Sequence, residues 1–120
     1  MKVLLAEDEP DVQLIARLSL KKAGFQVSTV NNGVEALDRV AVDRPDAILL
    51  DWMMPDMDGF ETCTRLKADP ATRDIPVIFL TAKVQESEVA RALALGAAGC
   101  IGKPFDALTL GAQVLAIIRP

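Results

Sequence analysis

The sequence predicts an α/β protein in which five parallel strands alternate with five helices. Five short apolar runs are separated by longer segments whose apolar residues recur at helical spacing. Three of these runs are almost uniformly apolar, which is typical of central parallel strands covered on both faces. Such alternation implies right-handed crossovers and an open sheet with helices on both faces. The predicted strands are Val3–Ala6, Gln26–Val30, Ala47–Leu50, Val77–Leu80 and Gly99–Ile101.

Capping residues place the helices between these runs. Pro10 suits a first helical turn, where its missing N–H costs nothing, and Gly24 suits the left-handed exit from the same helix. Asp58 is predicted to be an N-cap, with Glu61 three residues later as its capping-box partner. The run at Gln26–Val30 alternates in polarity and is expected at the edge of the sheet. The predicted helices cover about 10–23, 33–42, 59–69, 86–95 and 107–118.

Composition sets the broad class of protein. The 120 residues fit one domain, residues 1–120, and 51% of them are hydrophobic. A net charge of −4 argues against direct nucleic-acid binding, and no apolar run is long enough for membrane insertion. Cys63 and Cys100 form neither a disulfide framework nor a zinc spacing and are expected to be small buried hydrophobes in a cytoplasmic protein. The chain contains no histidine, which excludes histidine-based catalysis and a phosphohistidine-donor role.

Polar side chains follow four of the five predicted strands. Glu7 and Asp8 follow the first strand, Asp51 the third, Thr81 the fourth and Lys103 the fifth. In an open α/β sheet, ligands bind outside the carboxyl ends of the strands, where the strand order reverses. If the strand order is 2-1-3-4-5, these side chains meet in one crevice. Each residue alone is an ordinary loop or capping residue, so the joint pattern carries the prediction.

This set of side chains is suited to phosphoryl transfer. Three carboxylates in one crevice repel one another, so some would have raised pKa values unless a cation neutralises them. A site rich in oxygen and free of histidine and cysteine favours Mg²⁺. Lys103 supplies a positive charge and Thr81 a hydroxyl for phosphoryl oxygens. Transfer of a phosphoryl group to an aspartate needs positioning and charge neutralisation more than acid–base groups.

Five segments resemble the receiver domains of two-component response regulators, and the resemblance runs from Val3 to Arg119. It implies a flavodoxin-like doubly wound five-stranded parallel sheet of order 2-1-3-4-5 with five helices. The segments are weak evidence singly and specific together. They are Leu4–Pro10, Asp46–Asp51, Met54–Gly59, Pro76–Ala82, and Gly96–Gly99 followed by Lys103-Pro104-Phe105.

The resemblance also implies roles for single residues. Asp51 would be the acceptor that forms an acyl phosphate. Asp8 would ligate Mg²⁺ directly, Glu7 would act on it through water, and Met53 would offer its backbone carbonyl. Thr81 and Lys103 would hold phosphoryl oxygens.

The partners follow from the same resemblance. The phosphoryl donor would be the phosphohistidine of a histidine kinase or a phosphotransfer protein. Phosphorylation adds negative charge at Asp51 and would shift the face formed by the fourth helix, fifth strand and fifth helix, which would control a downstream target or output domain. The Lys103–Pro104 bond would be cis and would aim the lysine into the pocket.

The sequence departs from the family pattern at one position and has other notable residues near the site. The family often has an aromatic residue where Cys100 stands, so a coupling of Thr81 to a moving ring is not expected. Met53 and Lys83 are expected to flank the pocket and to tune access of water to the phosphate. Trp52 is expected to pack beside the site without stacking on a ligand.

The fifth helix carries two apolar stripes. Leu110, Val114 and Ile117 are predicted to face the core. Leu108 and Leu115 would then be partly exposed and could form a homodimer or partner surface, although scattered surface leucines are an equally simple reading.

Three other functions share parts of this pattern. A flavodoxin-like cofactor-binding module needs a Ser/Thr/Gly-rich loop after the first strand, where this chain has Glu7-Asp8-Glu9-Pro10. An aspartate-nucleophile phosphatase normally has its nucleophile after the first strand. A degenerate receiver acting as a phosphorylation-independent scaffold would not need the complete set of Asp8, Asp51, Thr81 and Lys103.

Overall fold

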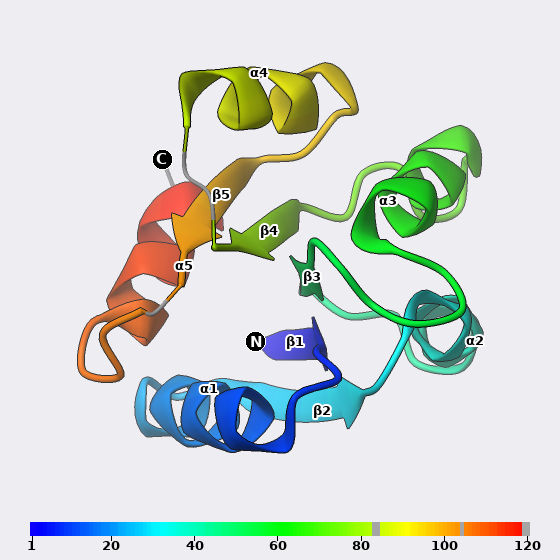
Figure 1. The fold of residues 1–120 in the computed structure, drawn as a ribbon. Helices are drawn as coiled ribbons and strands as arrows, with labels where there is room; N and C mark the ends of the chain where they lie inside the picture. The colour runs from blue at the N-terminus through cyan, green and yellow to red at the C-terminus, as the bar shows by residue number, and fades with distance from the viewer. Residues whose placement is uncertain (83–84, 104, 119–120) are drawn as a thin grey trace.

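The five strands form one parallel sheet in the predicted order, β2-β1-β3-β4-β5. The computed structural model describes residues 1–82, 85–103 and 105–118, and Figure 1 shows them as one layered unit. Every neighbouring pair of strands is parallel, so all carboxyl ends lie at the same edge of the sheet. The strands are β1 Lys2–Ala6, β2 Gln26–Val30, β3 Ala47–Asp51, β4 Val77–Thr81 and β5 Gly99–Gly102.

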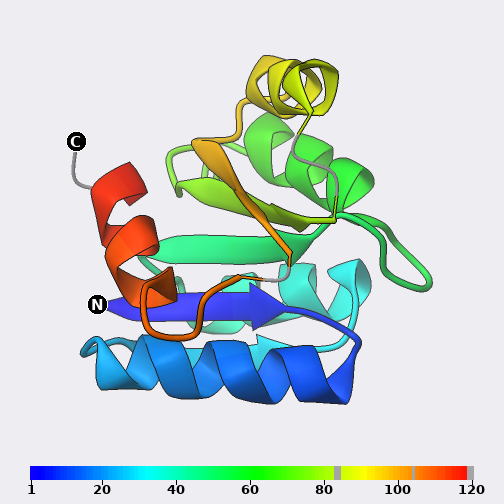
Figure 2. The same ribbon diagram turned by 60° about the vertical axis from the view of Figure 1, so that its left-hand side comes forward.

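Helices cover both faces of this sheet. Figures 1 and 2 show α1 and α5 on one face and α2, α3 and α4 on the other. One core cluster joins Leu5 and Leu49 to Leu20 and Leu110, and a second lies beneath α2, α3 and α4. The strands β3 and β4 are buried along their whole length, which explains their uniform apolar sequence. The helices are α1 Pro10–Lys22, α2 Gly33–Val42, α3 Gly59–Ala68, α4 Glu86–Ala94 and α5 Leu110–Ile118.

The predicted N-cap of α3 is confirmed, whereas the Glu61 side chain pairs with Arg65 at 3.2 Å and not with the Asp58 backbone. The Asp58 side chain accepts a hydrogen bond from the backbone N–H of Glu61 at 2.9 Å, and Asn32 caps α2 in the same way. Gly24 has φ +98°, a left-handed conformation that lets the chain leave α1. No helix among the described residues is both long and apolar enough to span a bilayer.

The predicted start of the fifth helix was wrong by three residues. The helix begins at Leu110 because a turn at Asp106 precedes it: the Asp106 carboxylate accepts from the N–H of Leu108, and its carbonyl accepts from Thr109 and Leu110. The core stripe is confirmed for Leu110 and Val114, which are fully buried. Ile117 is half-buried and packs on Gly99 of β5.

Candidate functional site

The site lies at the carboxyl edge of the central strands, where β1 and β3 are neighbours. Asp51 and Thr81 are the last residues of β3 and β4, as predicted, and each strand extends one residue beyond its apolar run. Backbone hydrogen bonds fix the flanking segments: the N–H of Glu7 donates to the carbonyl of Val30, and that of Lys103 donates to the carbonyl of Thr81. The sheet thereby brings one group from each of four strand ends to a common point.

Lys103 joins two of the carboxylates. Its Nζ lies 2.6 Å from Glu7 Oε1 and 3.0 Å from Asp51 Oδ1. Glu7 is fully buried, Asp51 is nearly so, and the Lys103 side chain is 16% exposed. An ammonium with this little exposure needs such partners, because an unpaired charge here would be strongly destabilising.

The charges within the site shift two pKa values. Burial, reinforced by the neighbouring Asp51 carboxylate, raises the pKa of Glu7 to about 7, although Lys103 opposes this. For Lys103, burial disfavours the ammonium, but the two carboxylates outweigh it and raise the pKa. Lys103 therefore stays charged at neutral pH, while Glu7 is close to its midpoint.

The acidic groups form a cluster suited to a hard cation. Carboxylate oxygens of Glu7, Asp8 and Asp51 lie within 4.8 Å of one another. Glu7 Oε1 is buried and accepts no hydrogen bond of normal geometry from the described residues, despite its short distance to Lys103. Asp8 is exposed, so the cluster is open to solvent on one side. All-oxygen sites of this kind suit Mg²⁺.

A pocket of about 340 Å³ opens above Asp51. It is lined by Trp52, Met53, Thr81 and Lys103 as well as by Asp51. Two further lining residues, Glu9 of the β1–α1 loop and Glu88 of α4, were not predicted. The sequence alone gives little reason to place them in a pocket, because acidic residues are common near the start of helices that border no functional site. Met53 is 77% exposed, and Thr81 is nearly buried.

Close packing holds the end of β3 against the start of α3. A Cβ on Gly59 would lie 2.4 Å from the Asp51 carbonyl oxygen, so this position requires glycine. The N–H of Gly59 donates to the Trp52 carbonyl, and the N–H of Trp52 donates to Leu80. The backbone on both sides of the Asp51 side chain is therefore fixed by its neighbours.

The remaining sequence predictions have mixed outcomes. Cys63 is fully buried as expected, whereas Cys100 is only half-buried. Trp52 packs edge-on against Phe60 and Phe79, in agreement with a packing role. Leu108 is 83% exposed, and Leu115 is half-buried against the core. Lys83 and the Lys103–Pro104 bond lie outside what the structure describes.

A larger cavity lies far from this chemistry. It measures about 810 Å³ and lies between the second halves of α2 and α3. Its walls are mostly aliphatic, with Arg44, Arg65 and Asp69 among the lining residues. None of the predicted site residues reaches it, so volume alone is a poor guide to function here.

Comparison with known proteins agrees with the fold and with the site. The family model of the response regulator receiver domain matches residues 3–115. The phosphate regulon transcriptional regulatory protein PhoB of Rhizobium meliloti is 42% identical over 118 residues, which are 98% of this chain and 52% of that protein. The chain thus spans about half the length of the curated relatives it matches.

Solved structures show the same architecture. The chemotaxis response regulator CheY4 of Vibrio cholerae superposes with a TM-score of 0.91 at 30% identity, covering 97% of each chain. The receiver domain of the sensor histidine kinase PA1611 of Pseudomonas aeruginosa superposes with a TM-score of 0.88 at 29% identity, covering 99% of this chain and 98% of that one, and is described with a magnesium ion coordinated in its active site cleft. With these matches and with the strand order observed, the chain belongs to the family of response regulator receiver domains, which act in two-component phosphorelay signalling.

Proposed function

We propose that Asp51 accepts a phosphoryl group from the phosphohistidine of a histidine kinase or a phosphotransfer protein. The observation that carries this proposal is the position of Lys103 Nζ, 3.0 Å from Asp51 Oδ1 at the floor of a pocket of about 340 Å³. In the transfer, the P–N bond to the donor imidazole breaks, a P–O bond to the Asp51 carboxylate forms, and the imidazole leaves. Water later hydrolyses the acyl phosphate.

The side chains around Asp51 have separate tasks in this proposal. Lys103 neutralises a phosphoryl oxygen, because it is charged and already directed at the acceptor. Thr81 offers its hydroxyl to a second oxygen from the end of β4. Met53 lines the pocket, where its side chain would restrict the approach of water. Positioning of the reacting groups and electrostatic stabilisation lower the barrier to transfer, as in other phosphoryl transfers.

We propose further that the carboxylates hold Mg²⁺. Asp8 and Asp51 would bind it directly, Met53 through its backbone carbonyl, and Glu7 through water. The cluster of carboxylate oxygens and the buried Glu7 Oε1 support this assignment. When bound, the ion would neutralise charge on the phosphoryl oxygens.

The partners and setting are proposals of the same kind. Residues 1–120 would act as one receiver domain in the cytoplasm, and phosphorylation would shift the α4–β5–α5 face toward a downstream protein or output domain. The domain itself would not bind nucleic acid; its relatives are about twice as long, so any DNA contact would belong to another module. Leu108, with Leu115 beside it, could contribute to a homodimer.

Mass spectrometry of the intact protein tests the central step. Wild type is incubated with Mg²⁺ and a small phosphodonor such as acetyl phosphate, and one added phosphoryl group is expected. Asp51→Asn should add none. The matched control is Asp56→Asn, because Asp56 is an exposed loop residue at φ 66° and asparagine tolerates this conformation.

Each outcome of this test has a definite meaning. A phosphoryl group retained by Asp51→Asn would remove Asp51 as the acceptor. Complete lack of phosphorylation in wild type, with Mg²⁺ and donor present, would favour the phosphorylation-independent scaffold instead.

A further inference from the structure

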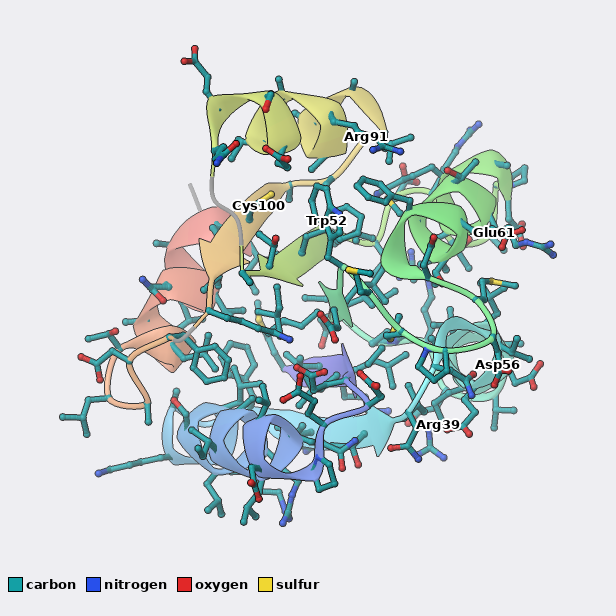
Figure 3. All side chains as sticks on the ribbon, in the orientation of Figure 1. Arg39, Trp52, Asp56, Glu61, Arg91 and Cys100 are labelled. Atoms are coloured by element: carbon teal, nitrogen blue, oxygen red, sulfur yellow. The ribbon has the colours of Figure 1, made fainter. Side chains whose placement is uncertain are left out.

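A chain of ring contacts connects the acceptor to helix α4. Trp52, the residue after Asp51, meets Phe60 of α3 edge-on, with ring centroids 4.0 Å apart and planes at 81°. The guanidinium carbon of Arg91, on α4, lies 4.0 Å from the centroid of the Phe60 ring. In Figure 3, Trp52 and Arg91 both lie in the region between α3 and α4.

The first link in this chain is rigid. Gly59, which precedes Phe60, packs directly on the Asp51 carbonyl, and the Trp52 backbone is hydrogen-bonded on both sides. Phe79 of β4 closes the cluster, 5.1 Å from the Trp52 ring and 5.6 Å from the Phe60 ring. Because the Trp52 and Phe60 rings are in contact and Phe79 lies behind both, a displacement of Trp52 is expected to be passed to the Phe60 ring.

The last link is weaker and can change. Arg91 is exposed, and a cation–π contact at an exposed site changes an equilibrium by about two- to fivefold. Cys100 on β5 is half-buried against the same core cluster and offers no ring of its own. Among the described residues, the contact of Arg91 with Phe60 is therefore the aromatic connection between α4 and the acceptor segment.

We propose that Trp52, Phe60 and Arg91 form a relay that couples the state of Asp51 to the position of helix α4. Phosphorylation of Asp51 moves Trp52, the Phe60 ring follows, and its cation–π contact with Arg91 changes. The population of α4 conformations then shifts, because Arg91 binds the ring differently in the two states. This inference rests on the proposed phosphorylation of Asp51.

Hydrogen exchange of α4, measured by mass spectrometry, tests the relay. Peptides covering Glu86–Ala94 are compared before and after phosphorylation with acetyl phosphate and Mg²⁺, and intact mass gives the phosphorylated fraction for each sample. Wild type is expected to change its α4 exchange on phosphorylation. Phe60→Leu, which removes the ring face, and Arg91→Gln, which removes the cation, should each reduce that change by about two- to fivefold at equal phosphorylation.

Combined and conservative variants sharpen this test. If the two residues act through one contact, the double variant should respond like either single variant, whereas independent effects would add. Phe60→Tyr keeps the ring and should respond like wild type. Arg39→Gln removes an exposed arginine on α2, far from Arg91 (Figure 3), and should also leave the response unchanged.

The outcomes separate this inference from the function on which it rests. Normal phosphorylation with an unchanged α4 response in Phe60→Leu and Arg91→Gln would overturn the relay and leave the acceptor role intact. Additive losses in the double variant would also overturn it. Absence of phosphorylation in wild type would contradict the proposed function and the relay together.

Discussion

Glu7→Gln should stabilise the protein in Mg²⁺-free buffer at pH 8, although it removes a residue of the proposed site. Glu7 is fully buried beside Asp51, and its pKa is raised from 4.5 to about 7. A carboxyl whose pKa is higher in the folded state than in the unfolded state favours folding below pH 4.5. That contribution is lost as the pH rises through 7.

The size of the effect follows from these two values. The interval from 4.5 to about 7 corresponds to a loss of about 3 kcal/mol of stability by pH 8. Glutamine has no charge and escapes this loss, but its amide cannot accept every contact made by the carboxylate, at a cost of about 1 kcal/mol. The free energy of unfolding should therefore rise by about 2 kcal/mol at pH 8, or roughly 5–10 °C in Tm.

Urea denaturation in EDTA at pH 5 and pH 8 measures this difference. At pH 5, Glu7 is protonated in the folded protein, so the gain from glutamine should disappear. Glu61→Gln, at an exposed position on α3, is the matched control and should stay within about 0.5 kcal/mol of wild type at both pH values. Adding Mg²⁺ should stabilise wild type more than Glu7→Gln, because a ligand that binds more tightly stabilises the folded state more at the same concentration.

Two results would refute this reasoning. A Glu7→Gln protein no more stable than wild type at pH 8 would show that ionisation of the buried Glu7 carboxyl does not destabilise the folded protein. An equal gain at pH 5 and pH 8 would show that the gain does not come from the charge.

Three further changes probe other parts of the structure. Asp58→Ala removes the cap of α3 and should cost about 1 kcal/mol in urea denaturation; an unchanged midpoint would contradict the capping role. Gly59→Ala places a Cβ 2.4 Å from the Asp51 carbonyl and should cost about 1–3 kcal/mol while lowering phosphorylation in the mass assay, and normal values for both would show that the backbone yields easily. Leu108→Glu should convert any dimer to monomer in sedimentation, since this side chain is 83% exposed; a dimer that persists would place the interface elsewhere.

The layered fold could be predicted because its signals are local. The uniform apolar runs of β3 and β4 report burial on both faces, and the pair Asp58 and Glu61 forms its hydrogen bond within a few residues. These patterns need no knowledge of the rest of the chain. Strand ends deviate by one residue, because pairing with a neighbour decides where a strand stops.

The start of α5 could not be predicted for the opposite reason. Asp106 has the sequence of an N-cap, but it closes a turn and the helix begins at Leu110. The packing partner of the first turn lies far away in sequence: Gly111 approaches α1 so closely that an added Cβ would meet the Cβ of Ala23 at 2.3 Å. The hydrogen bonds of the Asp106 turn are local, but this tertiary contact, which no local pattern shows, helps to decide where the regular helix begins.

The site shows the same division between local and collective properties. Topology alone brings Glu7, Asp51 and Lys103 together, because parallel strands present their carboxyl ends at one edge. The residue types do not reveal that Lys103 bridges the two carboxylates, or that Glu7 has no exposed surface. These facts set the charge balance of the site. When Glu7, Asp8 and Asp51 are all ionised, the single ammonium of Lys103 leaves two negative charges in excess. Such an excess is unfavourable in a partly dry pocket, and it makes the raised pKa of Glu7 and the proposed affinity for a divalent cation two consequences of one arrangement of charges.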